Sequence, residues 1–484
     1  MRSQSTPRLR WLLVALVGSL VLAACAPTAG PEGTTGETTP AGPGEEKSVE
    51  PAAEAAEVVK LVAWTIGPDD PSFHRRDNLL LAAEQLNEDL AAEGSNTQVE
   101  LEATFGGSGT DWGDYKQRFV LAAQADQAPD IVFSTFTDIA PWSEAGYIRP
   151  LGDLINPEEE PFSNIFPNLW EAMEYQGELW GIPQDVEARP WFYRADHLRE
   201  LGWSQEEIDA LPQRVLDGDF LMSDILDLAA QAQEQGLVEP GNGLWFRPVN
   251  GVDWYINYFN FGGVAQDEEG NLVLDTEAFR QELDLYHQAV SERNVTSPDF
   301  LGQEWQAWQT AWVNGEVFTV PAGVWFWAEW TDVYEQPVEE LQENIAYTLY
   351  PAAEEGGDPI TLSQPAAYMI SSDSENPELA AEILARASTI PMNIRHAVES
   401  AHLTIMQEGA EQPEYQQNEF LTDVTYMLEH TTFLPLHLDF GAYDTALWQA
   451  RSAVLAGQLE PEQGVEAAVS QLEATVPNVV ITGE

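Results

Sequence analysis

Short buried strands alternate with amphipathic helices at the start of the foldable part of the chain. Apolar runs predict strands at 58–64, 99–105 and 131–133. Apolar residues at helical spacing predict a helix over 76–93, and Asp111 is a good N-cap for a second helix. An order of strand, helix, strand, helix, strand is typical of a domain built on a parallel sheet. We therefore predict an α/β fold.

The same kind of pattern returns in the second half of the chain. Asp275 is a good N-cap for a helix, residues 317–320 form a predicted strand, and Asn376 with Pro377 begins another helix. The acidic segment 267–271 lies between short apolar runs, which predicts a hairpin turn in preference to a calcium loop. The length of the chain predicts two or three domains.

The N-terminal segment predicts export. Residues 1–24 carry three arginines before an apolar run that is too short to span a membrane, as in a secretory signal peptide. The sequence Leu22-Ala23-Ala24-Cys25 resembles the lipobox of bacterial lipoproteins, in which the cysteine becomes the lipidated N-terminus. A plain signal peptide with a chance cysteine is the alternative. Cys25 is the only cysteine, so the fold holds no internal disulfide.

The segment after the cysteine predicts a spacer. Residues 25–57 are rich in Gly, Pro, Thr, Ala and Glu and contain no aromatic residue, so they cannot bury a core. We expect a disordered tether between a lipid anchor and a folded body. The expected location is the extracellular or periplasmic face of a cell membrane.

The chain is extremely acidic. It has 81 Asp and Glu against 20 Lys and Arg, and a formal net charge of −61. Such a surface repels nucleic acid, so we expect no nucleic-acid partner. The acids are spread along the whole chain, which favours adaptation to salt or acid over a dedicated site. A cationic ligand is the other explanation.

Motifs of catalysis are not found in the sequence. It contains no HExxH, GxSxG, P-loop or GxGxxG. Histidines such as His396, His402 and His437 show no metal-ligand spacing, and each is expected to be a surface or core residue. A pair of glycosidase-like carboxylates is neither marked nor excluded among so many acids. We predict a protein that is not an enzyme and that needs no cofactor or metal.

A series of segments carries a family resemblance. In order, they are Ala128-Pro129-Asp130-Ile131-Val132-Phe133, Gly146-Tyr147-Ile148-Arg149-Pro150-Leu151, Gly177-Glu178-Leu179-Trp180-Gly181-Ile182-Pro183, Trp191-Phe192-Tyr193-Arg194-Ala195-Asp196, Asn314-Gly315-Glu316-Val317-Phe318 and Ser374-Glu375-Asn376-Pro377-Glu378. This series resembles the family 1 extracellular solute-binding proteins of ABC importers, of the maltose-binding type. The resemblance covers nearly all of the chain from residue 58 onward.

The resemblance implies a fold and a function. It implies the two-lobe periplasmic-binding-protein fold (type II-like), with a ligand cleft between lobes joined by a hinge of several crossings. The implied first lobe is 58–184 with 364–407, and the second is 185–363 with 408–484. The implied function is capture of a carbohydrate by a monomer that closes around it and delivers it to the membrane permease of an ABC transporter.

Carrying the family's positions over gives a candidate site of aromatic, hydroxyl and charged residues. Indole rings suit ligands with an apolar face and a polar rim, as sugars have, and the chain has 17 tryptophans. The candidate ligand contacts are Trp64, Thr65, Ser134, Thr135, Phe136, Asp185, Glu187, Trp254, Trp325, Trp327, Trp448 and Arg451.

Several of these residues have a structural alternative. Trp64 could be a core residue beneath the cleft, and Asp185 and Glu187 could cap the hinge. Trp325 and Trp327 would face the same side if they lay on a strand. Three further tryptophans fall at helical spacing and are expected to form a packed face; they are Trp305, Trp308 and Trp312.

Other classes of protein remain open. The charge allows a receptor for a cationic or peptide-like solute. The many carboxylates allow an extracellular glycoside hydrolase. The fold alone would also suit an adhesion or signalling lipoprotein, because a fold does not fix a function.

The lipobox yields the first prediction. Cys25→Ser removes the thiol that would accept lipid, so we expect the protein to be released from the membrane or left unprocessed. Membrane fractionation and the mass of the N-terminal peptide would show this. A Cys25→Ser protein that stays lipidated and anchored would contradict the prediction.

Overall fold

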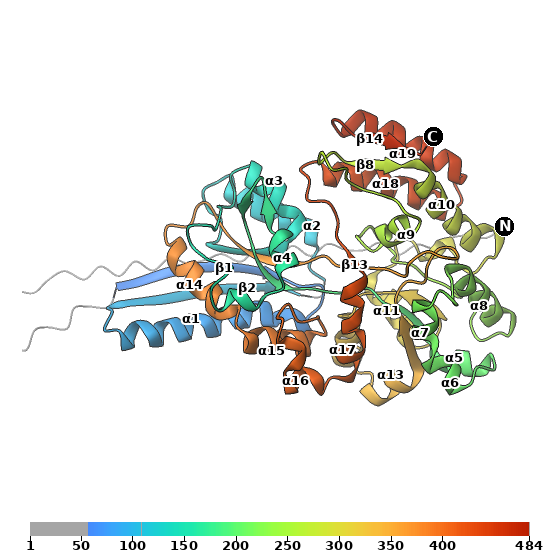
Figure 1. Ribbon diagram of the computed structural model, residues 1–484, viewed down its shortest axis with the longest axis horizontal. Coiled ribbons are helices and arrows are strands. Elements are labelled where there is room, and N and C mark those ends of the chain that lie inside the picture. Colours follow the sequence, from blue (N-terminus) through green and yellow to red (C-terminus); the bar gives the residue numbers. More distant parts are fainter. Residues whose placement is uncertain (1–56, 108, 484) are drawn as a thin grey trace, which may run out of the picture. The chain divides into compact units, whose positions relative to one another are not determined.

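The computed structural model describes residues 57–107 and 109–483, which belong to one compact unit (Figure 1). The predicted signal peptide (1–24), the lipidation site Cys25 and nearly all of the predicted tether (25–57) lie outside the described residues. Among the helices that are described, every one is too short or too polar to cross a lipid bilayer.

A mixed five-stranded sheet forms the first core. Its order is β2 (Thr97–Gly106), β1 (Glu57–Ile66), β3 (Ile131–Thr135), β12 (Ala366–Ile370) and β6 (Ile182–Asp185). β1 pairs in parallel with β2 and β3, while β12 runs antiparallel to both β3 and β6. The carboxyl ends of β1, β3 and β6 therefore meet at one edge, which is where ligands of open α/β sheets bind.

Helices cover this sheet, and α1 packs on β2, α14 and α15. α14 comes from far along the chain but packs on α1, close to the start of the described residues (Figure 1). The helices and the short hairpin of this part are α1 (His74–Ala92), α2 (Trp112–Ala123), α3 (Ile139–Glu144), α4 (Pro167–Glu171), α14 (Pro377–Ala387), α15 (Ile390–Ser400), β4 (Glu174–Tyr175) and β5 (Glu178–Leu179).

The predicted elements of the first half are confirmed, with ends shifted by at most two residues. Asp111 caps α2 by accepting a hydrogen bond from the backbone N of Asp114 (2.9 Å). Gly94 follows α1 with φ +79°, as expected for a residue that ends a helix in the left-handed region. Pro377 begins α14 as predicted, but Asn376 makes no side-chain capping bond.

A three-stranded antiparallel sheet forms the second core. Its order is β10 (Ile345–Thr348), β7 (Trp191–Arg194) and β9 (Thr319–Pro321). The helices near it are α5 (Ala195–Glu200), α6 (Gln205–Asp209), α7 (Leu211–Leu216), α8 (Met222–Glu234), α11 (Trp305–Val313), α12 (Phe326–Ala328) and α13 (Val338–Asn344). Trp308 and Trp312 of α11 are buried, which confirms the packed face that their spacing predicts.

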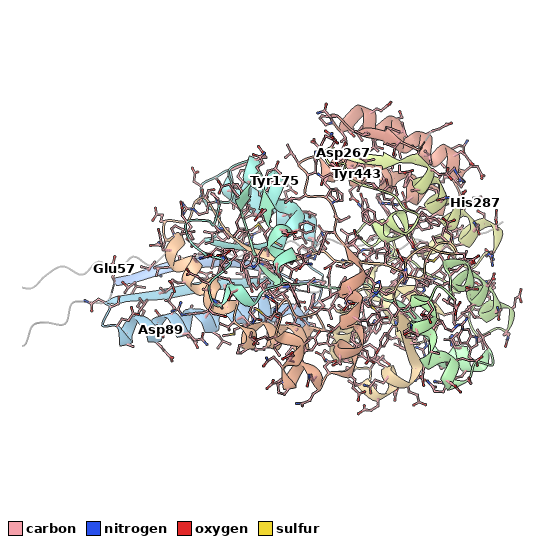
Figure 2. All side chains as sticks on the ribbon, in the orientation of Figure 1. Glu57, Asp89, Tyr175, Asp267, His287 and Tyr443 are labelled. Atoms are coloured by element: carbon pink, nitrogen blue, oxygen red, sulfur yellow. The ribbon has the colours of Figure 1, made fainter. Side chains whose placement is uncertain are left out.

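The C-terminal part of the chain forms a helical layer next to the parallel strand pair β8 (Val273–Asp275) and β14 (Val480–Thr482). Its helices are α9 (Trp254–Asn260), α10 (Thr276–His287), α18 (Phe440–Leu455) and α19 (Pro461–Thr475). Tyr443 Oη donates to the carbonyl oxygen of Val273 (2.6 Å) and fixes α18 to β8; Figure 2 labels it near Asp267. Asp267 forms a hairpin turn with Asn271, as predicted, and Asp275 caps α10.

Three stretches of chain join the two cores. One runs from β6 to β7, one from β11 (Thr361–Leu362) to β12, and one from α15 through α16 (Pro413–Gln416) and α17 (Glu419–Val424) to β13 (Thr431–Thr432). The first and third touch at a bridge between Val186 and Leu403, and the second and third pair as β11 with β13. The crossings therefore lie together as one bundle.

The segment around the predicted key tryptophans is helical. Trp325 is the N-cap of α12 and Trp327 lies within it, so the two do not share a face in the way that a strand would arrange them. The condition for a shared face, a strand through both residues, is not met because β9 ends at Pro321 and the chain turns at Gly323 into a helical turn.

Candidate ligand-binding site

The first crossing begins with a buried charge cluster. Asp185, at the end of β6, accepts hydrogen bonds from Arg75 Nε (3.1 Å) and Nη2, and His396 Nε2 lies 3.1 Å from the same Oδ2. All three residues are buried. Burial alone would raise the pKa of Asp185, but the charge of the Arg75 guanidinium and the hydrogen bond from His396 hold it well below its usual range. Asp185 thus stays ionised and ties α1 to the crossing.

The hydrogen bonds of this cluster determine which ring nitrogen of His402 carries the proton. Arg75 Nη2 can only donate, so His402 Nε2 (3.3 Å away) accepts, and its proton sits on Nδ1, 3.0 Å from the Ser400 carbonyl oxygen. Burial lowers the pKa of His402 well below its usual value, so the ring is neutral.

The histidines come together in a way that their spacing did not predict. Ligand atoms of Asp185, His396 and His402 lie within 4.8 Å of one another, as a metal site would need. The Arg75 guanidinium, however, bonds to Asp185 and His402 and supplies the positive charge. We interpret the cluster as an ion pair with two neutral histidines, which agrees with the expectation that His396 and His402 are core residues.

A second charge cluster follows four residues along the crossing. Arg189 Nε donates to Asp253 Oδ1 (2.8 Å), its Nη1 donates to the Leu362 carbonyl oxygen (2.8 Å), and its Nη2 contacts Glu187. Arg247 Nη1 adds a bond to Asp253 Oδ2 (2.9 Å). Burial raises the pKa of Glu187 to about 7 even though Arg189 opposes this shift. Glu187 is therefore harder to ionise than an exposed glutamate.

Trp325 lies between the two clusters. The His402 ring stacks on it at 6.0 Å between centroids and 19° between planes, and the Arg189 guanidinium carbon lies 5.2 Å from the ring centroid. Only 4 % of Trp325 is exposed. The structure thus brings Asp185, Glu187 and Trp325 together at the crossing.

The predicted hydroxyl residues lie at the carboxyl edge of the first sheet. Ser134 Oγ donates to Asp138 Oδ2 (2.5 Å), and Lys116 Nζ lies 2.8 Å from the same oxygen and 3.1 Å from Thr135 Oγ1. Thr65 Oγ1 donates to the Thr104 carbonyl oxygen (2.8 Å). These hydroxyls already have protein partners, with Thr135 the only one of the three that is not fully buried.

The remaining aromatic predictions fall in different surroundings. Trp64 is half-buried under the guanidinium of Arg118, which lies 3.9 Å from the ring centroid. Trp254 is buried and lies 5.4 Å from the half-buried ring of Trp448. Phe136 helps line a cavity of about 490 Å³ together with Phe433. This cavity is bounded by residues of α4 from the first core and of α9 from the C-terminal layer.

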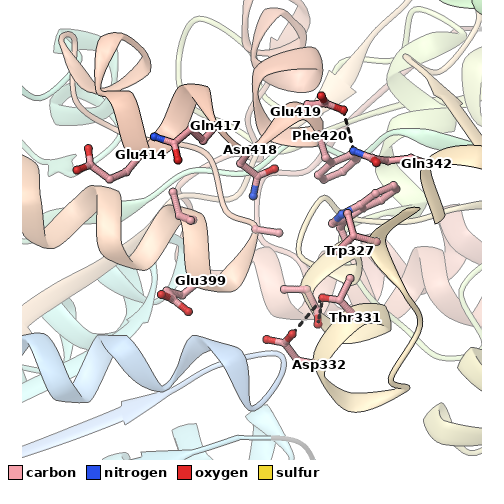
Figure 3. Close-up of a pocket in the computed structure, with 14 residues that line it drawn as sticks. Trp327, Thr331, Asp332, Gln342, Glu399, Glu414, Gln417, Asn418, Glu419 and Phe420 are labelled. Atoms are coloured by element: carbon pink, nitrogen blue, oxygen red, sulfur yellow. Dashed lines mark hydrogen bonds between the residues drawn. The ribbon is translucent and has the colours of Figure 1, made fainter. Parts of the chain in front are cut away.

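Trp327 lines a larger cavity of about 640 Å³ (Figure 3). Its ring stacks on Phe420 at 4.3 Å and 6°. Figure 3 shows carboxylates and amides around the space, among them Glu399 of α15 and Gln342 of α13. The lining contains no basic residue. Of the predicted contacts, Trp327 alone lies here.

Arg451 is placed away from both cavities. Its side chain is fully buried, and Nε and Nη2 donate to Glu282 Oε1 (2.7 Å) and Oε2 (3.1 Å). Tyr286 Oη donates to the same carboxylate (2.7 Å). This ion pair joins α18 to α10 within the C-terminal layer. We therefore leave Arg451 out of the site proposed below.

Sequence reasoning did not select several residues that hold the site together. Arg75 and Arg189 are the chief examples, and Asp253 completes the second cluster. The alternation Asp185-x-Glu187-x-Arg189 within an otherwise apolar crossing is a signal that could have found Arg189. Arg75 has no such signal, because its partner is distant in the sequence.

The fold and this junction define a class of α/β binding proteins with two lobes joined by several crossings. A model of the bacterial extracellular solute-binding protein family matches residues 80–387, which is more than half of the chain. The chain belongs to this family, as the sequence resemblance predicts.

Solved structures of similar fold agree. The GacH receptor of Streptomyces glaucescens, solved unliganded and with acarbose, has a TM-score of 0.69 and 16% identity over 87% of this chain and 100% of its own. Maltose-bound MalE3 of T. maritima has a TM-score of 0.68 and 15% identity, and the match covers 86% of this chain and 100% of MalE3. The MalE domain of Bdellovibrio bacteriovorus with maltotriose has a TM-score of 0.66 and 17% identity, and the match covers 87% of this chain and 100% of that domain. The predicted fold class is thereby confirmed.

The Arg451–Glu282 pair generates a stability prediction. Arg451→Met leaves Glu282 buried without its cation, so we expect a loss of about 3–5 kcal/mol in the free energy of unfolding. The double variant Arg451→Met with Glu282→Leu removes both charges and should recover most of this loss. Urea unfolding measures both. Unchanged stability with a large loss of ligand affinity would instead support the sequence prediction that Arg451 contacts ligand.

Proposed function

We propose that this protein captures a carbohydrate between two lobes and delivers it to the permease of an ABC transporter. The observation that carries the proposal is the junction itself, where Trp325 lies between His402 and Arg189, the residues that contact the carboxylates of Asp185 and Glu187. An indole face and carboxylates that accept hydroxyl hydrogen bonds are what sugars need. The proteins of similar fold that were solved with acarbose, maltose or maltotriose support this choice of ligand.

The proposed lobes follow the sequence boundaries, 58–184 with 364–407 and 185–363 with 408–484. His402 then belongs to the first lobe and Trp325 to the second, so their stacked rings form an interlobe contact. If the lobes separate, one face of Trp325 is uncovered, and a sugar ring could replace the imidazole. The proposed contacts are Trp64, Thr65, Ser134, Thr135, Phe136, Asp185, Glu187, Trp254, Trp325, Trp327 and Trp448.

Membrane attachment and transport complete the proposal. A lipid on Cys25 would hold the protein at the outer face of a membrane, where the permease can meet it. We propose that it acts as a monomer and has no enzymatic activity. The family match and the binding proteins of similar fold support the proposed lack of enzymatic activity, and they give no support to the glycoside hydrolase alternative.

A cationic solute is the second candidate, and the net charge of −61 favours it. Thermal unfolding against mono- and oligosaccharides, with amino acids and polyamines as controls, separates the two. A ligand that binds only the folded protein raises its Tm. A rise with one class of sugar that does not change with added salt supports carbohydrate capture. A rise with polyamines alone that salt abolishes would contradict it.

Trp325 provides a sharper test. Trp325→Ala should weaken the affinity for a sugar found in that screen by about 2–4 kcal/mol, because buried aromatic contacts dominate binding energies. Trp203→Ala, at a partly buried tryptophan near Arg214, is the matched control and should leave affinity unchanged. Calorimetry at a temperature where circular dichroism shows both variants folded gives the comparison. Equal affinities would remove Trp325 from the site.

A further inference from the structure

Lys116 lies in α2 at the carboxyl edge of the first sheet. Its neighbour Tyr115 is buried, and the Tyr115 Oη lies 2.9 Å from the carbonyl oxygens of both Trp64 and Phe133. Those carbonyls belong to the adjacent parallel strands β1 and β3, close to their carboxyl ends. Since Tyr115 fixes α2 to both strands, Lys116 is held at the edge where ligands of open α/β sheets bind.

A hydrogen-bond network connects Lys116 to two of the proposed ligand contacts. Its ammonium can only donate, and Nζ lies 3.1 Å from Thr135 Oγ1 and 2.8 Å from Asp138 Oδ2. Ser134 Oγ (2.5 Å) and Thr135 Oγ1 (3.2 Å) donate to the same carboxylate oxygen. Asp138 Oδ2 therefore has three donors from within the protein.

Each member of this ion pair keeps a polar group that the protein does not use. An ammonium has three N–H donors, and among the described residues only Thr135 and Asp138 accept from Lys116. No described residue donates to Asp138 Oδ1, and that oxygen is not enclosed. The Lys116 and Asp138 side chains are 29 % and 13 % exposed, so solvent reaches both. One donor and one acceptor therefore lie side by side at an accessible position.

We propose that Lys116 and Asp138 together bind two neighbouring hydroxyls of the carbohydrate. One hydroxyl accepts a hydrogen bond from the Lys116 ammonium, and the other donates to Asp138 Oδ1. The inference rests on the proposed function and adds to it the polar group that the site selects, a pair of adjacent hydroxyls. Hydrogen bonds with an ionised partner are stronger than those between neutral groups, so this pair contributes to affinity as well as to orientation.

The ion pair suits a neutral solute better than a charged one. A cationic solute would meet like charge at Lys116, and an anionic solute would meet like charge at Asp138, which selects against both. A partly exposed ion pair contributes little to stability, and Asp138 Oδ2 keeps two hydroxyl donors without the lysine. Loss of the ammonium is therefore expected to change binding far more than folding.

Lys116→Met keeps the length of the side chain and removes its charge. The probe is the mono- or oligosaccharide that raises Tm most in the thermal-unfolding screen, with glucose, maltose and maltotriose among those screened. Its affinity, measured by calorimetry, should fall about tenfold to a hundredfold, as expected for one lost hydrogen bond to a charged group. Lys60→Met is the matched control, at a 76 % exposed lysine that pairs with Glu100 (3.3 Å), and should keep full affinity. Unchanged affinity of Lys116→Met overturns the proposal.

Monodeoxy forms of the same sugar decide whether the contact is direct. The form that lacks the hydroxyl bound to Lys116 should bind the unsubstituted protein more weakly, but Lys116→Met should bind it as well as the parent sugar. The hydroxyl next to it on the ring should be coupled in the same way to Asp138→Asn. Circular dichroism establishes that both variants are folded. Losses that multiply for every deoxy form would show that Lys116 acts only through the structure, and they overturn the proposal.

The chain offers a direct readout because its only lysines are Lys47, Lys60 and Lys116. In protein with isotope-labelled lysine, the side-chain nitrogen signal of Lys116 is the one that Lys116→Met removes. Saturation with the probe should move this signal and leave that of Lys60 in place. A probe that binds without moving the Lys116 signal overturns the inference and leaves carbohydrate capture standing. A screen in which no sugar raises Tm overturns both.

Discussion

The ion pair between Arg75 and Asp185 is the constraint on which the junction depends. Asp185 ends β6, so whatever holds it also sets where the first crossing leaves the first sheet. Arg75 comes from α1, and the same guanidinium bonds to His402 of the third crossing. One buried cation thus fixes two crossings against one helix. The remaining polar atoms of the cluster are satisfied by His396 and Ser400, as a buried ion pair requires if it is not to be a net loss.

The buried carboxyl groups at and near the junction differ in the direction of their pKa shifts. Asp185 and Asp253 each face guanidinium groups, and in both cases these overcome the effect of burial and lower the pKa. Glu187 shares Arg189 with Asp253 and keeps a raised pKa, while the buried Glu329 and Asp69 form no ion pair with any described residue. The chain has four acids for every base, and two of its arginines, Arg75 and Arg189, lie buried where the crossings meet.

The sequence predicted the fold well where local signals are strong. Asp111 and Asp275 cap helices as expected, and the apolar runs at 58–64 and 131–133 form neighbouring parallel strands. It did not show that Trp325 and Trp327 lie in a helical turn, because a spacing of two residues alone does not distinguish a strand from a short helix. It also missed the approach of His396, His402 and Asp185, since this contact depends on how the third crossing returns to the first.

For the candidate site, the sequence predicted which types of residue are present, but it did not predict how exposed each side chain is. The family resemblance predicted Asp185, Glu187 and Trp325 as ligand contacts, and the structure places them close to one another where the crossings meet; whether they bind ligand stays a prediction. Burial could not be anticipated in the same way. The Trp325 ring is covered by His402 and Arg189, which are distant from it in sequence, and Arg451 is enclosed by Glu282 of another helix. The two cases have opposite consequences. The cover on Trp325 includes a residue that the proposed lobes assign to the other side, so lobe movement can remove it. The cover on Arg451 comes from its own layer, so the same movement leaves Arg451 buried.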